Sequence, residues 1–143
     1  MCLIIDANVV RETFLHRHAD FAPIFDSIMS GMARLSYGGK LTREYLQSHA
    51  FAKHLIQLDR AGRAKKENDA RVNAKTIEVE QSGLCLSNDA HIVGLALVGG
   101  ARLLCSRDID LHQDFTNPAL IANPRGSVYQ NPSHAHLIRR HCA

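Results

Sequence analysis

The sequence predicts a single α/β domain with a central parallel sheet covered by helices on both faces. Apolar runs such as residues 2–5 (CLII) and 101–105 (ARLLC) lack the alternation of a strand with one solvent face, which indicates burial on both sides. The first run is followed by residues 7–19, which have helical spacing, and strands alternating with helices favour a parallel sheet. A chain of 143 residues with 45% hydrophobic and 22% charged residues supports one core, so we expect one domain over residues 1–143.

The next elements follow from apolar spacing and glycine punctuation. Residues 21–31 predict a second helix closed by its terminal glycine, and residues 33–39 predict a short strand that ends in a glycine pair. Residues 40–66 have helical spacing throughout and are expected to form two helical pieces. The residues expected to fix the start of the first piece are Thr42 as N-cap and Leu41 with Leu46 as a hydrophobic staple.

The pattern weakens and then returns in the second half. Residues 67–83 predict no defined element, because a loop with a short helix and a strand are both compatible with them. Residues 87–100 predict an almost wholly apolar helix in which Gly94 permits close packing and a glycine pair ends the helix. The last strand is expected at 126–130 and a short helix at 134–141.

Composition excludes several classes of protein. The N-terminal segment has no basic region, and Asp6 interrupts its apolar stretch, so we expect no signal peptide. The longest apolar segment is shorter than the ~20 residues of a membrane helix. The four cysteines form no CxxC pair, which predicts reduced thiols in a cytoplasmic protein that does not interact with membranes. The net charge of +3 aids approach to a polyanion without requiring one.

Acidic residues stand where the predicted strands end. Asp6 follows the first strand directly, and Asp108 follows the strand at 101–105 after Ser106 and Arg107. Asp89 stands at the start of the buried helix that leads into that strand. In parallel sheets, ligands bind beyond the carboxyl ends of the strands. We therefore expect three carboxylates, from distant parts of the chain, to lie at one edge.

Each acid also has a structural interpretation, because Asp is common at helix N-caps and turns. Their coincidence favours a site, since gathered carboxylates raise one another's pKa unless a cation neutralises them. Mg²⁺ or Mn²⁺ is the natural partner, because these ions prefer oxygen ligands and are usually held by one or two carboxylates with substrate phosphate oxygens.

Three segments resemble the PIN-domain nucleases, a family that includes the ribonuclease toxins of bacterial toxin–antitoxin pairs. They are IIDANVV at residues 4–10, SNDAHIVGLAL at 87–97 and ARLLCSRDIDL at 101–111, in the order and spacing of that family. The resemblance implies a three-layer α/β/α sandwich whose acidic cluster binds Mg²⁺ or Mn²⁺. It also implies hydrolysis of a phosphodiester by a metal-activated water, with RNA favoured over DNA as the substrate and the choice between them left open by the sequence.

The resemblance assigns roles to individual residues. Asp6, Asp89 and Asp108 match catalytic and metal-binding acids, and Asp110 is a secondary metal-binding acid. Asn8 and Ser106 are supporting residues, Asn8 by hydrogen bonding to Asp6. Glu44 is the best match for a fourth catalytic acid, although a glutamate in a first helical turn also interacts well with the helix dipole.

Other charged residues are assigned from the predicted elements. Lys40 and Arg43 shortly precede Glu44 in the sequence and are candidates for contacts to substrate phosphates. The basic run RAGRAKK at residues 60–66 is an alternative nucleic-acid surface, or a solvated helix end. Asp114 is expected to tether a loop, and Glu12 is expected to face solvent.

The functional expectation is a metal-dependent endoribonuclease, with an antitoxin or a second copy of the chain, as a homodimer, as candidate partners. The alternative from a different class is a PIN-like interaction module for nucleic acid or protein with weak or no catalysis. A phosphatase that forms an aspartyl-phosphate is disfavoured because Asn8 stands where its second acid is needed. A dinucleotide-binding domain is disfavoured because no GxGxxG follows the first strand.

Overall fold

The computed structural model describes residues 2–142. Within them, five strands form one sheet in the order β3-β2-β1-β4-β5, and every neighbouring pair is parallel. This confirms the predicted parallel sheet, with the first strand central and the ARLLC strand beside it. The strands are β1 (Leu3–Ile5), β2 (Leu35–Tyr37), β3 (Ala64–Lys66), β4 (Leu103–Cys105) and β5 (Ser127–Tyr129).

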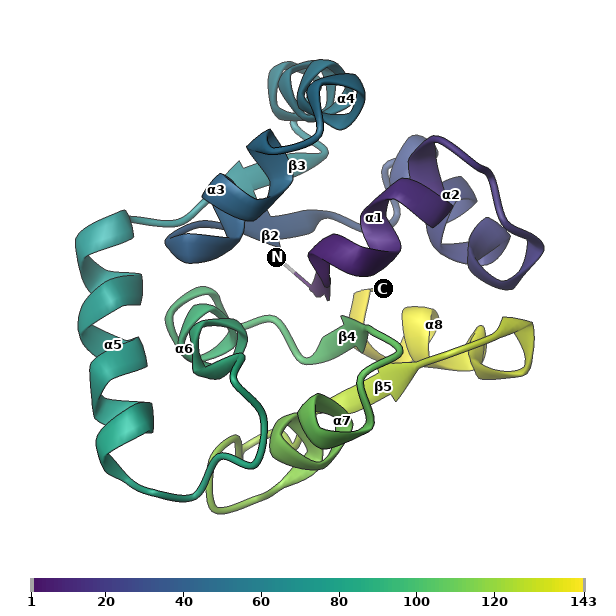
Figure 1. Ribbon diagram of the computed structural model, residues 1–143. Helices are drawn as coiled ribbons and strands as arrows, with labels where there is room; N and C mark the ends of the chain where they lie inside the picture. The colour runs from purple at the N-terminus through teal and green to yellow at the C-terminus, as the bar shows by residue number, and fades with distance from the viewer. Residues whose placement is uncertain (1, 143) are drawn as a thin grey trace.

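Helices lie on both faces of the sheet, as a three-layer sandwich requires (Figure 1). The apolar runs of β1 and β4 are fully buried between these layers. None of the helices in the described residues is long and apolar enough to cross a bilayer. The α-helices are α1 (Ala7–Phe14), α2 (Ala22–Met29), α3 (Lys40–Leu46), α4 (His49–Arg60), α5 (Asp69–Gln81), α6 (Ala90–Gly99), α7 (Ile109–Thr116) and α8 (His136–Cys142), and the 3-10 helices are η1 (Ala19–Phe21) and η2 (Pro132–His134).

The segment without a predicted element, residues 67–83, forms the long helix α5, capped by the Asn68 side chain, which accepts from the Arg71 backbone N–H. In Figure 1, α5 runs beside α6 at one side of the molecule. Its apolar positions are sparse, with Val72 and Val79 buried. Because most of its surface is polar, the sequence showed no apolar stripe from which the helix could be predicted.

Gly94 allows α6 to approach α5 closely, as predicted. A Cβ atom at this position would lie 2.5 Å from Thr76 Oγ1 and 2.9 Å from the Thr76 backbone nitrogen. The contact with the backbone nitrogen cannot be relieved by rotating a side chain. The two helices therefore pack at a distance that any larger residue at position 94 disturbs.

Replacing Gly94 by Ala is expected to destabilise the protein by about 2 kcal/mol through overpacking. The direction of the change in the free energy of unfolding is informative, because replacing Gly by Ala inside an unhindered helix normally stabilises a protein by about 1 kcal/mol. Chemical denaturation measures the difference. Adding Thr76→Ala should restore only part of the loss, because the backbone nitrogen stays in place. A Gly94→Ala variant as stable as the wild type would contradict this packing.

Three expectations for residues 40–66 are wrong at the ends of the helices. Helix α3 begins after Gly39, which is its N-cap at φ +58°, so Thr42 lies inside the helix. Leu46 is 50% exposed and forms no staple with the buried Leu41. The basic run leaves α4 through a turn at Gly62 and ends in β3, which pairs with β2. Glycines with positive φ and tertiary pairing override helical spacing here.

The expectation of four reduced thiols is also wrong, because Cys2 and Cys142 form a disulfide. Their Cα atoms are 5.1 Å apart although 140 positions separate them in the sequence. The start of β1 and the end of α8 meet, and Figure 1 marks both chain ends in the same region. This proximity is a product of the tertiary fold that cysteine spacing does not show. The thiols of Cys85 and Cys105 are free.

Candidate active site at the carboxyl edge of the sheet

The carboxyl ends of β1 and β4 bring together residues that are 100 positions apart. The strands are in register from Leu3 opposite Leu103 to Ile5 opposite Cys105. The Asp6 backbone N–H extends this pairing by donating to the Cys105 carbonyl oxygen at 2.9 Å. The residues after the two strands, Asp6 and Ser106, are therefore neighbours, as the sheet topology predicted.

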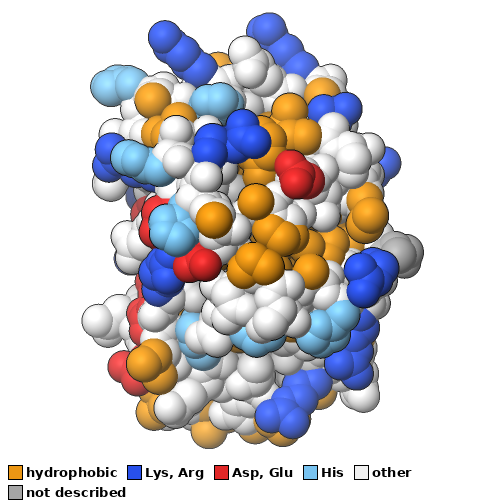
Figure 2. Space-filling model, turned by 90° about the vertical axis from the view of Figure 1, so that its right-hand side faces the viewer, with side chains coloured by type: hydrophobic (Ala, Val, Ile, Leu, Met, Phe, Trp, Pro, Cys, Tyr) orange, Lys and Arg blue, Asp and Glu red, His pale blue; other side chains and the backbone are white. Residues whose placement is uncertain are grey.

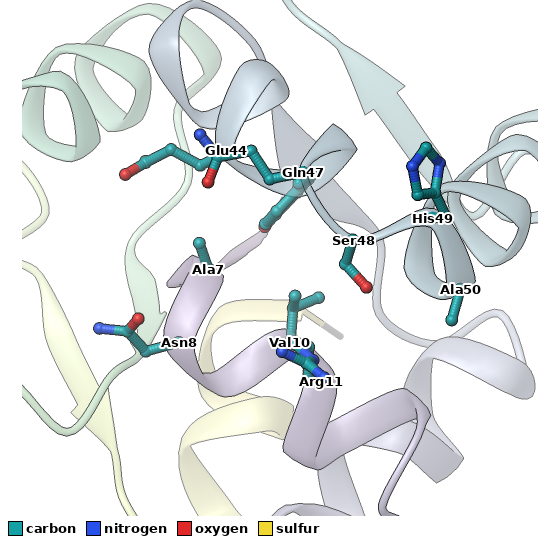
Figure 3. A pocket seen from close by; sticks show the side chains of 10 residues that line it. Ala7, Asn8, Val10, Arg11, Glu44, Gln47, Ser48, His49 and Ala50 are labelled. Atoms are coloured by element: carbon teal, nitrogen blue, oxygen red, sulfur yellow. The ribbon is translucent and has the colours of Figure 1, made fainter.

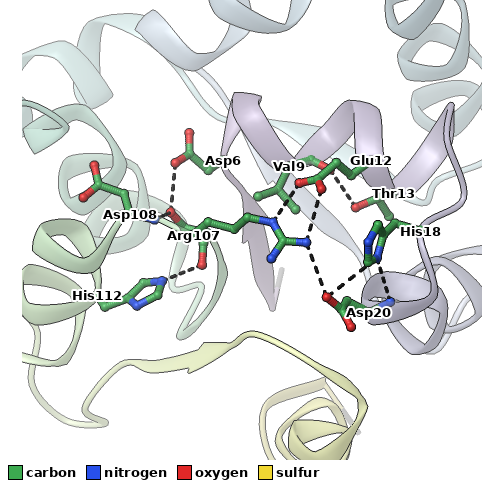
Figure 4. A network of polar contacts seen from close by, with 10 residues as sticks. Asp6, Val9, Glu12, Thr13, His18, Asp20, Arg107, Asp108 and His112 are labelled. Carbon is green, nitrogen blue, oxygen red and sulfur yellow. Dashed lines mark hydrogen bonds and ion pairs between the residues drawn. The ribbon is translucent and has the colours of Figure 1, made fainter.

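Ser106 connects two of the candidate acids. Its fully buried hydroxyl group donates to Asp6 Oδ2 at 2.9 Å and accepts from the Asp108 backbone N–H at 3.1 Å. Figure 4 shows Asp6 and Asp108 on either side of this link. The supporting role assigned to Ser106 thus corresponds to direct contacts that orient both residues.

Asp6 is a buried carboxyl group with few compensating contacts. It is 7% exposed, and burial raises its pKa above the usual 3.8, opposed by the hydrogen bond from Ser106 and reinforced by the charge of Glu44. Although Asp6 is the N-cap residue of α1, its side chain accepts no capping hydrogen bond of normal geometry, and the nearby Asn8 backbone N–H lowers the pKa of Asp6 by less than burial raises it. Helix capping therefore does not explain why an acid stands here.

Glu44 and Asp89 approach the same region from α3 and from the start of α6. Glu44 Oε1 lies 2.7 Å from His91 Nε2, and His91 Nδ1 lies 4.0 Å from Asp89 Oδ1. His91 is 5% exposed, so one buried imidazole lies between two acids. The helix-dipole alternative for Glu44 does not account for this contact.

The pKa of Asp89 is also raised. Burial is the main cause, and the negative charges of Asp6, Glu44 and Asp108 add to it, while His91 opposes them. Like Asp6, Asp89 occupies an N-cap position without a capping hydrogen bond from its side chain. Asp6, Glu44 and Asp108 are thus close enough to Asp89 for their charges to affect its ionisation.

Asp108 and Asp110 behave differently from Asp6 and Asp89. Asp108 Oδ1 accepts from the backbone N–H groups of Asp110 at 3.0 Å and Leu111 at 3.3 Å, which is a helix cap for α7. The capping interpretation therefore holds for Asp108, which can use its second oxygen elsewhere. Asp110 is exposed in the first turn of α7.

The donor set suits a hard divalent ion held partly by solvent or substrate. Among residues 2–142, no group of three or more His, Cys, Asp and Glu side chains is arranged to hold a metal ion by itself. Mg²⁺ and Mn²⁺ usually need one or two protein carboxylates and take their other ligands from water and phosphate. The uncapped carboxylates of Asp6 and Asp89, close enough for the charge of Asp6 to raise the pKa of Asp89, fit that requirement.

Tyr45 and His112 support the site and were not predicted. The fully buried Tyr45 hydroxyl donates to the Ile5 carbonyl oxygen, which fixes α3 against the end of β1 and keeps Glu44 near Asp6. His112 Nε2 lies within hydrogen-bond distance of the Ser106 carbonyl oxygen. Both partners are distant in sequence or depend on the path of a loop, so no local pattern signals these contacts.

The expectation that Glu12 faces solvent holds only in part, because its side chain is 30% exposed and pairs with Arg107. Arg107, inside the Ser-Arg-Asp element, donates to Glu12 Oε2 at 3.0 Å and Oε1 at 3.2 Å, and to Asp20 Oδ2 at 3.4 Å. Figure 4 shows this network between the loop after β4 and the end of α1. Arg107 thus ties that loop to α1 and η1, and its charge is already engaged.

Within residues 2–142, the side chains of Asn8, Lys40 and Arg43 form no hydrogen bond or ion pair with the buried acids. Asn8 is exposed, and no hydrogen bond joins its side chain to Asp6 among the described residues. Lys40 and Arg43 are exposed on α3. Arg43 lines a separate cavity of about 310 Å³ around Asp69, where its charge helps to lower the pKa of Asp69, after the larger effects of the Gly39 N–H and of Lys66.

A larger cavity of about 570 Å³ opens beside the acids, between α1 and the junction of α3 and α4. Figure 3 shows Asn8 and Glu44 at its edge. The surface of the molecule is mixed in charge but poor in acids on one face. Figure 2 shows Lys, Arg and His side chains spread over that face and few Asp or Glu side chains, which suits approach of a polyanion.

Comparisons with known proteins confirm the fold. No family model and none of the curated proteins matches the chain. Among solved structures, it is similar to a chain in the crystal structure of VapBC2 from Rickettsia felis bound to a DNA fragment from their promoter, with a TM-score of 0.56 and 15% sequence identity. The likeness covers 92% of this chain and 99% of that chain. At this identity it shows the fold alone, and that fold is the PIN-like α/β/α sandwich that the sequence predicted.

Proposed function

We propose that the chain is a Mg²⁺- or Mn²⁺-dependent endoribonuclease. The observation that carries the proposal is the meeting of Asp6, Glu44 and Asp89 beside Asp108 at one end of the sheet. Two of these acids, Asp6 and Asp89, lie at helix starts without capping them, and both have raised pKa values. An arrangement that is electrostatically unfavourable without a cation is best explained by binding one.

The residues of the chain divide into ligands and supports. Asp6 and Asp89 would hold the ion, with Glu44 and Asp108 beside them and Asp110 as an outer acid. A bound divalent ion supplies a water of lowered pKa and neutralises charge that develops on the phosphate. Ser106 orients Asp6, and His91 positions Glu44. Tyr45 keeps α3, which carries Glu44, against the end of β1.

Partners follow from the same proposal. RNA is favoured over DNA as substrate by the resemblance of the three sequence segments to PIN-domain nucleases. The fold it shares with a chain of the VapBC2 structure supports a small antitoxin protein as a partner. Association of two copies as a homodimer rests on the family resemblance.

Replacing Glu44 by Gln tests the proposal at the acid that α3 contributes. Wild-type protein is expected to cut a fluorogenic RNA when Mn²⁺ or Mg²⁺ is titrated in, and to stop when EDTA is added. Glu44→Gln should lower the rate by roughly 10- to 100-fold, as losses around metal ligands do. Glu80→Gln, at an exposed position of α5, is the matched control and should cut like the wild type.

The interaction module is the second candidate, favoured by the absence of a ready three-ligand group among residues 2–142. In that case the wild type would bind RNA or a protein partner, and Mn²⁺ would produce no cleavage at any concentration. Equal rates for the wild type and Glu44→Gln would also count against the nuclease.

A further inference from the structure

We propose that the 570 Å³ cavity between α1 and the α3–α4 junction binds the nucleotide next to the cleaved bond, with Arg11 contacting its phosphate and Gln47 its base. The inference rests on the proposed function, because it places the substrate of that site. It names a binding surface different from Lys40 and Arg43, the residues that the sequence favoured.

The cavity shares Glu44 with the carboxylate edge. Glu44 and Asn8 line it, and Glu44 also contacts His91 among the acids. Figure 3 shows the opening between α1, which begins directly after Asp6, and the end of α3, which carries Glu44. A strand whose phosphate lies at the acids therefore has this cavity as an adjoining space for its next unit.

The polar side chains around the cavity are not engaged elsewhere. Arg11, Gln47 and His49 are exposed, and within the described residues none of their side chains takes part in a hydrogen bond or ion pair. Arg107 provides the contrast, because its guanidinium group is held by Glu12 and Asp20. A guanidinium group without a carboxylate partner is suited to a phosphate, and an amide is suited to a base edge.

The floor and size of the cavity also suit a nucleotide. Ala7, Val10 and Ala50 contribute apolar surface between the polar groups, against which the face of a base or ribose can pack. A volume of about 570 Å³ lies within the roughly 300 to 1,000 Å³ of small-molecule sites. The volume of the cavity and its combination of apolar surface with unpaired polar groups favour a single nucleotide, rather than a second protein chain, as the occupant.

Arg43 does not line this cavity, so it is not placed to contact the same nucleotide. It lines the separate cavity near Lys66 and Asp69, which shares no lining residue with the opening that contains Gln47. Two routes for the RNA are thus distinguishable, one over α1 and one over Lys40 and Arg43. The first has unengaged donors that adjoin the acids, which is why we favour it.

Binding without cleavage tests the route. Fluorescence anisotropy with a labelled RNA of about ten nucleotides and mixed sequence, in buffer with EDTA and at several salt concentrations, measures Kd and its salt dependence. Arg11→Ala should weaken binding and reduce the salt slope by about 0.7, the value for one lost contact to a single strand, and Arg11→Lys should restore most of the slope. The double variant Lys40→Ala/Arg43→Ala is the matched control and should keep the wild-type slope.

Base contact is tested in the same assay with homopolymer RNAs. Gln47→Ala should change the ratio of Kd values between the preferred and the other homopolymers by roughly tenfold. Gln81→Ala, at an exposed position of α5 outside the cavity, is the matched control and should leave the ratio unchanged. Circular dichroism confirms that each variant is folded. Unchanged binding in Arg11→Ala together with a lost slope in the double variant would overturn the proposal, as would absence of RNA binding by the wild type. Failure of the nuclease proposal is distinguishable, because it would abolish cleavage while these binding differences remain.

Discussion

Asp6→Asn is expected to abolish metal-dependent RNA cleavage while making the metal-free protein more stable at neutral pH. Asn keeps an oxygen that can accept the hydrogen bond from Ser106, now made to Asp6 Oδ2, but removes the charge. Mutation of a residue that only supports a metal ligand lowers activity by up to roughly 100-fold. Removal of the ligand itself should lower the cleavage rate by more than this. Activity and stability therefore change in opposite directions.

The raised pKa of Asp6 also fixes the direction in which the free energy of unfolding changes with pH. The folded-state pKa of Asp6 is raised above 3.8, so the folded protein binds this proton more tightly than the unfolded chain does. The free energy of unfolding of the wild type must fall as the pH rises from 3.8 through the raised pKa, and it stays lower above it. Asp6→Asn has no carboxyl group to titrate at this position, so its free energy of unfolding does not fall in this way. The extra stability of the variant over the wild type should be absent below pH 3.8 and complete above the raised pKa of Asp6.

Denaturant unfolding across that pH range, in EDTA, measures the advantage. Asp26→Asn, an exposed acid on α2, is the control and should show almost no advantage at any pH. Adding Mn²⁺ should stabilise the wild type more than Asp6→Asn. The idea would be refuted if Mn²⁺ raised both melting temperatures equally and both proteins cut RNA at the same rate.

Asp114→Ala is expected to destabilise the protein by about 3 kcal/mol, because three charge-assisted hydrogen bonds to a buried carboxylate are lost. The carboxylate of Asp114, 1% exposed, accepts from the Leu86 N–H at 2.8 Å, the Ser87 N–H at 3.0 Å and the Ser87 hydroxyl at 2.6 Å. This confirms that Asp114 tethers a loop. The loop leads into Asp89, so cleavage should fall as well.

Gln113→Ala, the exposed neighbour on α7, is the control for Asp114→Ala and should change stability by less than about 0.5 kcal/mol. Hydrogen exchange offers a second measurement, because the amides of Leu86 and Ser87 should lose protection in Asp114→Ala. Protection equal to that of the wild type would show that other contacts hold the loop.

The sequence was most informative where a rule links chain order to position. Because the strands are parallel, the residues after β1 and β4 had to share an edge, and Asp6 and Ser106 do. Gly94 signalled close packing because a residue without a side chain, in the middle of a buried helix, leaves room for a neighbouring backbone. These features depend on one residue and its neighbours in the chain.

The sequence was silent where a side chain meets a distant partner. The contact between Glu44 and His91 spans 47 positions, and that between Tyr45 and Ile5 spans 40. Neither has a periodicity or motif of its own. The disulfide of Cys2 was missed for the same reason, and β3 was taken for the end of a helix because its pairing with β2 leaves no trace in local spacing.

Four segments that are distant in the sequence share the acidic edge, and this also determines when the edge can form during synthesis. Asp6 leaves the ribosome 100 residues before its partner Ser106. Strand β4 must then insert beside β1 before Asp89 and Asp108 can join it. A nascent chain that ends before this point lacks Asp108 and the contact of Ser106 with Asp6, so the acidic edge cannot be arranged until β4 and the residues after it have been made.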